Sequence, residues 1–317
     1  MPDTSMLYST LTATAYAKLN LALHVTGQRN DGYHLLDTLV AFADYGDELS
    51  VSIAEQDSFT LSGRFGAGLP VDGGNLVLKA RDLLRAHFPQ HNTPVAIHLE
   101  KKLPVASGIG GGSSDAATVL ALLHKLWNIQ PEQALLEQIC LQLGADVPMC
   151  LHGQLHGGTL IAKGIGEELQ TLSALPVLPL VLVNDGTAIS TPQIFKHLRK
   201  RDNPALQDIG ARHSQTDLCD YLKTTRNDLF QPAAEIAPQL PQIVKLLQDS
   251  GAEYAQMSGS GATCFGIYAT LSEAQLAAEQ LQQQNPHWFI CASTTLPLKR
   301  IPKSVSGFRD KMRVKQK

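Results

Sequence analysis

Residues 104–117 are the feature of this chain that most restricts how it can fold. They read Pro-Val-Ala-Ser-Gly-Ile-Gly-Gly-Gly-Ser-Ser-Asp-Ala-Ala and lead into apolar residues at three- and four-residue spacing. Before them, residues 95–99 alternate apolar and polar side chains, as a half-buried strand does. The stretch therefore predicts a strand, a glycine-rich loop and an amphipathic helix, in that order.

This loop has the properties of a phosphate site. Glycine allows backbone angles closed to other residues and lets a ligand approach the main chain; the glycines are Gly108, Gly110, Gly111 and Gly112. Good N-cap residues follow them, namely Ser113, Ser114 and Asp115. The N–H groups at a helix start attract anions. A flexible loop that only happens to precede a helix is the alternative, and the combined features favour phosphate binding.

Two common phosphate motifs do not fit the loop. The Walker A pattern requires a Lys after its last glycine, and no Lys follows these glycines. A dinucleotide fingerprint requires a third Gly or Ala, and Ser113 or Asp115 occupies that position. The loop is therefore predicted to be a phosphate loop of a third kind.

The composition excludes several classes of protein. The chain has 317 residues, which is enough for two domains. Its net charge of −3 gives no general attraction to nucleic acid or anionic membranes. No apolar run is as long as a membrane span, and the first residues lack the pattern of a secretory leader. Five scattered cysteines suit a reducing compartment. We expect a cytoplasmic protein that binds neither nucleic acid nor membrane.

Strand and helix patterns are mixed along the chain without strict alternation, which is typical of an α+β protein. Strands are expected at 17–25, with one buried face, and at 178–183. A turn is expected at 28–32, with strand or short helical pieces at 33–42 and 48–53. Helices are expected at 75–87, 131–143 (with Pro131 in its first turn), 241–250 and 272–285.

Lys18 and Asp146 are the candidates for chemistry. Lys18 lies on a predicted strand with Asn20 on the same face, and Asp146 lies in a turn between a helix end and a proline. Taken alone, each has an ordinary interpretation, as a solvent-facing lysine and as a turn carboxylate. If the loop binds a nucleoside triphosphate, however, phosphoryl transfer to an alcohol needs a cation and a base. These two residues would supply them.

Further candidates concern the second ligand. Gly259, Ser260 and Gly261 form a loop whose N–H groups could face an acceptor molecule, although a tight strand turn is an equal alternative. Aromatic and imidazole rings that could hold a flat polar ring belong to Tyr33, His34 and Phe195. Core packing is the alternative for each aromatic. The histidines and cysteines show no metal-binding spacing.

With these motifs in place, the chain resembles the GHMP kinases, the superfamily of galactokinase, homoserine kinase, mevalonate kinase and phosphomevalonate kinase. The segments 17–20, 104–117 and 257–262 match its motifs in order, and the likeness spans about residues 13–300. Residues 27–34, 144–148 and 190–195 resemble the branch that acts on a cytidyl diphosphate sugar alcohol in the non-mevalonate isoprenoid pathway.

The resemblance implies an α+β fold with two domains. An N-terminal ATP-binding and catalytic domain like domain 2 of ribosomal protein S5 is expected at 1–168. A ferredoxin-like substrate-binding domain is expected at 169–300, followed by a basic tail at 301–317 that is either solvated or contacts anions.

The resemblance also implies roles for single residues. Asp146 matches the catalytic base and Lys18 its electrostatic partner. ATP is expected on Pro104, Val105, Ala106, Ser107, Gly108, Ile109, Gly110, Gly111, Gly112, Ser113 and Ser114. The acceptor is expected on Asn20, Tyr33, His34, Thr191 and Phe195, together with the 259–261 loop. Mg²⁺ is implied as well, but its ligands are not identified; the hydroxyl of Ser113 is a candidate contact only.

Two alternatives remain at this point. The same fold could phosphorylate homoserine or mevalonate, or it could be a non-catalytic nucleotide-binding regulator. The partner implied by the resemblance is a small-molecule substrate, and we expect a monomer or weak homodimer.

Overall fold

The computed structural model describes residues 10–172, 175–210 and 214–299. The predicted basic tail at 301–317 therefore lies outside the described residues. The chain packs as two compact units, each made of separate segments. Unit 1 is drawn from residues 1–17, 45–105 and 110–155, and unit 2 from residues 18–44, 106–109 and 156–317. The predicted domain boundary after residue 168 stays a prediction.

Two long strands, β1 (Leu11–Gln28) and β2 (His34–Ile53), pair with each other and each contributes to both units. The predicted turn joins them, with Arg29 N–H donating to Tyr33 O at 2.7 Å. The two separate pieces expected at 33–42 and 48–53 form one strand instead. Gly46 lies within this strand, where a Cβ would be only 2.9 Å from the Cα of Tyr16 on β1, so that a larger residue would not fit.

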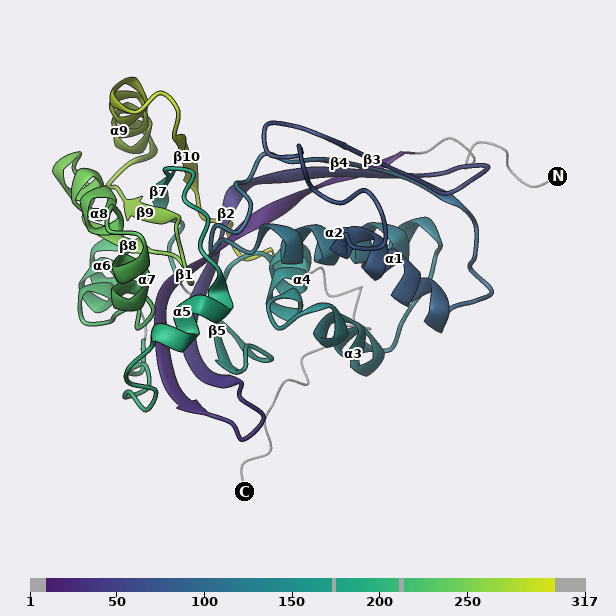
Figure 1. Ribbon diagram of the computed structural model, residues 1–317, viewed down its shortest axis with the longest axis horizontal. Helices are drawn as coiled ribbons and strands as arrows, with labels where there is room; N and C mark the ends of the chain where they lie inside the picture. Colours follow the sequence, from purple (N-terminus) through teal and green to yellow (C-terminus); the bar gives the residue numbers. More distant parts are fainter. Residues whose placement is uncertain (1–9, 173–174, 211–213, 300–317) are drawn as a thin grey trace. The chain divides into compact units, whose positions relative to one another are not determined.

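Unit 1 contains paired β-strands with helices along one face. The second half of β2 pairs antiparallel with β4 (Val95–Glu100), which pairs in parallel with β3 (Ser58–Ser62). Figure 1 shows the helices of this unit along one face of these strands: α1 (Leu76–His87), α2 (Gly111–Leu126), α3 (Gln133–Leu143) and α4 (Val147–His156). The predicted helices are confirmed, but Pro131 precedes α3, whose N-cap is Glu132.

Unit 2 contains two sets of strands. The first half of β2 pairs with β5 (Thr159–Gly164), which pairs with β6 (Glu168–Leu172). A separate antiparallel sheet has the order β10-β7-β9-β8, with β7 at Pro179–Asn184, β8 at Tyr254–Met257, β9 at Cys264–Ile267 and β10 at Phe289–Thr294. The long helices α8 (Leu240–Asp249) and α9 (Leu271–Gln284) connect its strands in a βαββαβ sequence. This topology confirms the expected ferredoxin-like domain.

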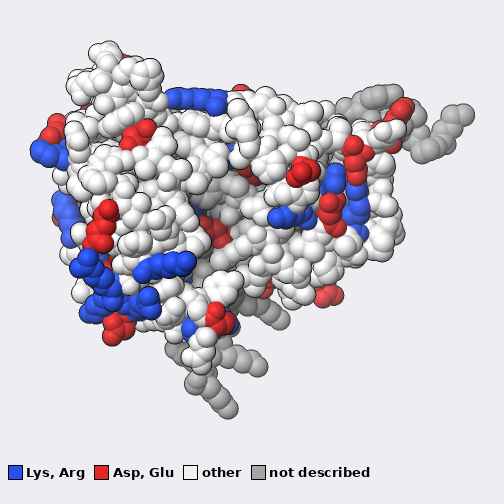
Figure 2. All heavy atoms as spheres, in the orientation of Figure 1, with Lys and Arg blue, Asp and Glu red and all other residues white. Residues whose placement is uncertain are grey.

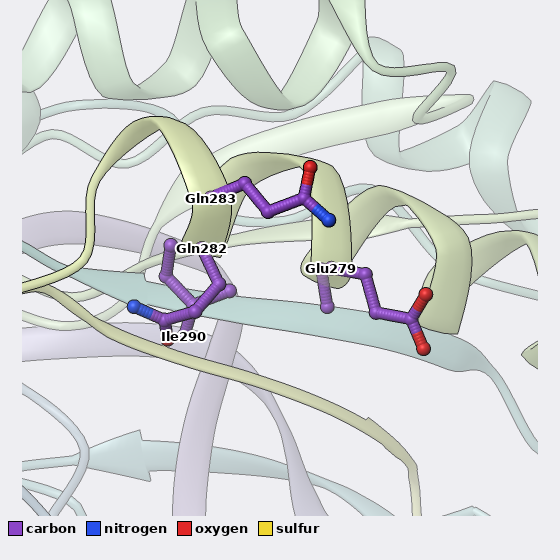
Figure 3. Close-up of a pocket in the computed structure, with 5 residues that line it drawn as sticks. Glu279, Gln282, Gln283 and Ile290 are labelled. Carbon is purple, nitrogen blue, oxygen red and sulfur yellow. The ribbon is translucent and has the colours of Figure 1, made fainter.

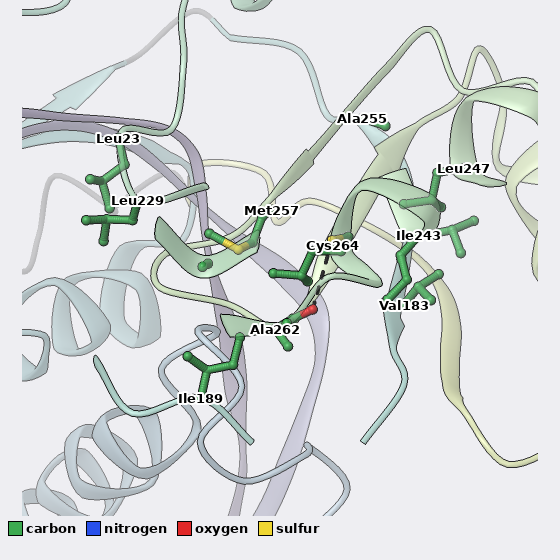
Figure 4. Close-up of a cluster of buried hydrophobic side chains, with 14 of the residues drawn as sticks. Leu23, Val183, Ile189, Leu229, Ile243, Leu247, Ala255, Met257, Ala262 and Cys264 are labelled. Atoms are coloured by element: carbon green, nitrogen blue, oxygen red, sulfur yellow. Dashed lines mark hydrogen bonds between the residues drawn. The ribbon is translucent and has the colours of Figure 1, made fainter. Parts of the chain in front are cut away.

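Shorter helices complete unit 2, namely α5 (Thr191–His197), α6 (Gln215–Lys223) and α7 (Phe230–Ile236). The core of this unit lies between the four-stranded sheet and its helices, as Figure 4 shows for Val183, Ile243, Leu247 and Met257. Burial of one such aliphatic side chain stabilises the fold by about 1.5–3 kcal/mol. This core fixes the ends of β8 and β9, and the loop between them carries part of the site.

Four of the five cysteines are buried, and no disulfide joins any of the five. Burial raises the pKa of Cys140, Cys219 and Cys291 to about 12, which keeps these thiols protonated. Among the described helices, none combines the length and the hydropathy needed to cross a membrane.

Candidate active site

Lys18 and Asn20 begin a buried chain of hydrogen bonds in unit 2. Lys18 Nζ donates to Asn20 Oδ1 at 2.9 Å, and Asn20 Nδ2 donates to Thr38 Oγ1 at 2.8 Å. Thr38 Oγ1 in turn donates to Ala22 O at 2.6 Å. The expectation of one buried face on this strand is wrong, because every residue from 17 to 25 is buried. The ordinary interpretation of Lys18 as a solvent-facing lysine is excluded for the same reason.

Ser258 joins the three sequence motifs. Its hydroxyl accepts a hydrogen bond from Asn20 N–H at 3.1 Å and donates one to Gly108 O at 3.0 Å. Backbone contacts strengthen the junction: Lys18 N–H donates to Ile109 O at 2.9 Å, and Thr263 N–H donates to Ser107 O at 3.0 Å. Residues of β1, the tip of the glycine loop and the β8–β9 loop therefore form one hydrogen-bonded assembly in unit 2.

Two glycines in this assembly are required by close approach of the backbones. Gly108 has a φ of +75°, and a Cβ there would lie 2.6 Å from the nitrogen of Gly261. Gly259 has a φ of +55°, and its Cβ would lie 2.7 Å from Gly108 O. Any larger residue at either position would push the two loops apart.

The start of α2 differs from the expectation. The N-cap is Gly110, with a φ of +67° and no side-chain cap, so the helix begins at Gly111. The prediction that Ser113, Ser114 or Asp115 caps the helix is therefore wrong: they lie inside it, and Ser114 Oγ donates to Tyr16 O at 2.7 Å. The left-handed glycine turns the chain into the helix without a capping side chain. The first N–H groups of α2 have no acceptor within the helix and carry a partial positive charge.

Parts of the glycine loop are open to a ligand. Its small residues leave the main chain accessible, since a Cβ at Gly112 would meet nothing closer than 3.5 Å, the distance to Leu76 Cδ1. Val105 and Ala106 are exposed at the start of the loop, whereas Pro104 and Ser107 are buried. Within unit 1, the open glycines and the helix start at Gly111 together have the form of an anion site.

Asp146 lies in unit 1, in the turn between α3 and α4. Gly144, with a φ of +155°, ends α3, and Asp146 O accepts the first helical hydrogen bond of α4 from Cys150 N–H at 3.1 Å. The residue is half-buried. The catalytic role of Asp146 stays a prediction.

Two of the predicted acceptor residues stack in unit 2. The rings of His34 and Phe195 lie 4.5 Å apart between centroids at an interplanar angle of 20°. Burial, and then the positive charge of Arg201, lower the pKa of His34, so the imidazole stays neutral at pH 7. Tyr33 is 56% exposed. Thr191 Oγ1 lies 2.7 Å from Ser260 Oγ, which joins α5 to the 259–261 loop.

Basic side chains gather over α5 in the space-filling view (Figure 2). The exposed basic residues of this segment are Lys196, Arg199, Lys200 and Arg201. After burial, the positive charge of Arg201 is the second cause of the lowered pKa of His34. The segment therefore makes a locally positive region in a chain whose net charge is −3.

Two domain models of one protein family match the chain. The profile of the GHMP kinases N terminal domain matches residues 75–154, and that of the GHMP kinases C terminal domain matches residues 195–287. Together they cover more than half of the chain. This chain belongs to the GHMP kinase family.

Relatives place this GHMP kinase within the family. It is 54% identical over 287 residues to a 4-diphosphocytidyl-2-C-methyl-D-erythritol kinase of Brucella abortus, covering 90% of this chain and 96% of the relative. A kinase of the same name from Rhizobium etli is 49% identical over 286 residues, covering 90% and 95%. The chain is therefore a member of the 4-diphosphocytidyl-2-C-methyl-D-erythritol kinase branch, and it is an ATP-dependent kinase.

Solved structures agree with this membership. A crystal structure of a 4-(cytidine 5'-diphospho)-2C-methyl-D-erythritol kinase matches with a TM-score of 0.73 at 32% identity, covering 90% of this chain and 99% of the other. A mevalonate kinase of L. major matches with a TM-score of 0.68 at 17% identity, covering 92% and 98%. The second likeness concerns the fold alone.

Sequence reasoning missed several residues of this GHMP kinase that hold the site together. Thr38 extends the Lys18–Asn20 chain, and Asn227 Nδ2 donates to both Met257 O and Gly259 O at 2.8 Å. Ser258 stands beside the recognised glycines and could have been found from its place in the motif. Thr38 and Asn227 are ordinary polar residues far away in the sequence, and no local pattern indicates them.

The remaining observations involve none of the predicted site residues. A hollow beside α9 and β10 is lined by Ala278, Glu279, Gln282, Gln283 and Ile290, as Figure 3 shows. Within the described part of the chain, no group of three or more His, Cys, Asp or Glu residues is placed to hold a metal ion.

Proposed function

We propose that this protein transfers the γ-phosphoryl group of ATP to the 2-hydroxyl of 4-diphosphocytidyl-2-C-methyl-D-erythritol, a step of non-mevalonate isoprenoid precursor biosynthesis. The observation that carries the proposal is the Ser258 junction. It binds the strand with Lys18 and Asn20 to the tip of the glycine loop. The relatives with this name support the choice of acceptor.

In the proposed mechanism, Asp146 accepts the proton of the acceptor hydroxyl as that oxygen attacks. Lys18, oriented by Asn20, offsets the negative charge that develops around the transferring group. ATP supplies the phosphoryl group when bound. The chain itself contributes position and electrostatics, with direct in-line transfer and no covalent enzyme intermediate.

The glycine loop, residues 104–114, would hold the phosphates through its backbone and the start of α2. Mg²⁺ usually binds through substrate phosphates with few protein ligands. We propose that it enters with ATP and that the Ser113 hydroxyl is its protein contact. The ion would neutralise phosphate charge.

The acceptor would bind through the ring of its base. His34 and Phe195 already stack with each other, and Tyr33 is exposed next to His34. A cytosine ring offers both a flat face for stacking and polar edges for hydrogen bonds. Homoserine and mevalonate have no ring, so this pair favours the cytidyl compound. The basic residues that follow α5 would attract its diphosphate.

We also propose that the protein acts in the cytoplasm on this small molecule, without nucleic acid or membrane, as a monomer or weak homodimer. Sedimentation of the purified protein at several concentrations tests the oligomeric state. A stable tetramer would contradict it.

Two measurements test the function. ATP consumption should be seen with the cytidyl compound in a panel that also contains mevalonate and homoserine. Asp146→Asn should bind a non-hydrolysable ATP analogue normally but lose about 10²–10⁴-fold in kcat. Turnover retained by Asp146→Asn would overturn the assignment of the base, and activity only with another alcohol would overturn the acceptor.

A further inference from the structure

A buried cluster of three ionisable side chains lies in unit 1, outside every role described above. Lys101 Nζ contacts Asp47 Oδ2 and lies 2.6 Å from Asp115 Oδ2. No side chain of the three is more than 5% exposed. Asp47 comes from β2, Lys101 follows β4, and Asp115 comes from α2, so one ammonium joins three elements.

The second oxygen of Asp47 extends the cluster to the backbone. Asp47 Oδ1 accepts hydrogen bonds from Lys102 N–H at 2.6 Å and Leu103 N–H at 2.8 Å. These residues directly precede Pro104, where the glycine loop begins. Asp115 lies just after the loop, in the first residues of α2. The cluster therefore ties the chain entering the loop to the chain leaving it.

The cluster also lies beside the helix start. A Cβ at Gly111, the first residue of α2, would lie 3.5 Å from Lys101 Nζ and 3.7 Å from Asp47 Oδ2. The cluster therefore borders the space next to the main chain at Gly111, where the first N–H groups of α2 lie.

Stability alone does not explain such a cluster. Burial raises the pKa of Asp115, an effect that Lys101 opposes and Asp47 reinforces. Burial alone would lower the pKa of Lys101, but the two carboxylates outweigh it and raise this pKa. Asp115 Oδ1 is buried without a hydrogen-bond partner. Buried ions gain little over a well-packed apolar core, so a role in fixing geometry is the better explanation.

We propose that Asp47, Lys101 and Asp115 are positioning residues for the ATP-binding loop. They hold its two ends at a fixed separation and so preorganise the N–H groups at the start of α2 before the nucleotide binds. The inference rests on the proposed role of the loop in holding ATP. Preorganisation increases affinity because less ordering is needed on binding.

The experiment compares variants that cut this link with one that keeps it. Lys101→Met removes the ammonium at similar length, and Asp115→Leu removes the acceptor oxygens while keeping the branching of the side chain. Asp115→Asn retains an oxygen that can accept from Lys101. We expect the first two to weaken binding of a non-hydrolysable ATP analogue, measured by calorimetry, by about tenfold or more. Asp115→Asn should restore most of the affinity that Asp115→Leu loses.

Asp57→Asn is the matched control for a purely structural loss. Asp57 is paired with Arg85 at 2.6 Å and accepts from Val95 N–H at 2.8 Å, away from the glycine loop in the sequence but in the same unit. This variant should lower the melting temperature while leaving analogue affinity and KM for ATP unchanged. The Lys101 and Asp115→Leu variants should raise KM for ATP but leave KM for the acceptor unchanged.

Each outcome decides the proposal. If Lys101→Met behaves like Asp57→Asn, with a lower melting temperature and unchanged affinity, the cluster is structural only and the proposal is overturned. If Lys101→Met does not fold, the Asp115→Leu and Asp115→Asn pair decides, and equal affinities for the two overturn the proposal. A wild-type protein that does not bind the analogue would refute the proposed function instead.

Discussion

Lys18 in unit 2 and Lys101 in unit 1 are buried to the same degree, at 4% and 3% exposure, but their surroundings differ. Lys101 lies between two carboxylates that fix it in place. Lys18 donates to the neutral amide of Asn20, within a chain that ends at a backbone carbonyl. The Asn20 contact orients the ammonium of Lys18. Equal burial therefore does not give the two lysines equal surroundings.

The largest predicted effect on activity is that of replacing Lys18. Lys18→Met should lower kcat by about 10²–10³-fold, the usual effect of removing one electrostatic contact to a transition state. Affinity for the ATP analogue should change far less. Steady-state kinetics on protein shown to be folded by circular dichroism measure both effects.

Lys101→Met is the natural counterpart, since it should reverse this pattern. It should lower the melting temperature by about 5–15 °C, because two buried carboxylates lose their partner. Its main kinetic effect should fall on KM for ATP. If both lysine variants lost kcat equally and kept KM, the distinction between the two regions would fail.

A smaller effect is expected at the acceptor rings. Phe195→Ala should raise KM for the cytidyl substrate by about 10- to 100-fold, since stacking on one base contributes about 1–3 kcal/mol. KM for ATP should stay unchanged, because the ring of Phe195 stacks on His34, a residue proposed to hold the acceptor.

Phe230→Ala provides the control for this variant. Phe230 packs against the core of unit 2, so its loss should reduce stability without raising KM for the acceptor selectively. Equal increases in both KM values for Phe195→Ala would remove the claim that this ring holds a base.

Only part of the fold and of the site could be predicted from the sequence. The strand, loop and helix around residues 104–117 could be predicted because turn chemistry and helical periodicity are local properties. The capping of α2 could not, since a left-handed Gly110 replaces the serine cap that the sequence favours. The continuity of β2 across residues 43–47 was also missed, and the close approach of Tyr16 explains why this strand can contain Gly46.

The roles of Lys18 and Asp146 came from resemblance to a family, and they stay predictions. No local pattern in the sequence indicates the ion cluster around Lys101. Its carboxylates lie 54 and 14 residues away in the sequence, and only the fold brings them to one ammonium. Long-range ion clusters of this kind are set by topology, which no local pattern encodes.

The smallest predicted effect is a pH dependence of stability through Asp115. Burial raises its pKa in the folded state, with Lys101 opposing and Asp47 reinforcing the shift. The unfolded chain therefore releases this proton at a lower pH than the folded protein. Between the two pKa values the folded state binds more protons, so the free energy of unfolding falls as pH rises, by at most about 1.4 kcal/mol per pH unit.

Asp115→Asn removes this titration but keeps the oxygen that faces Lys101. Urea unfolding of both proteins between about pH 5 and pH 8 should show the stability of the wild type falling relative to the variant as the pH rises. The other titrating groups are common to both proteins and cancel in the difference. A difference that stays constant with pH, or that grows in favour of the wild type, would mean that Asp115 is already ionised in the folded state. Lys101 would then hold two carboxylates as charged groups, and the cluster would be fixed by charge on both sides of the ammonium.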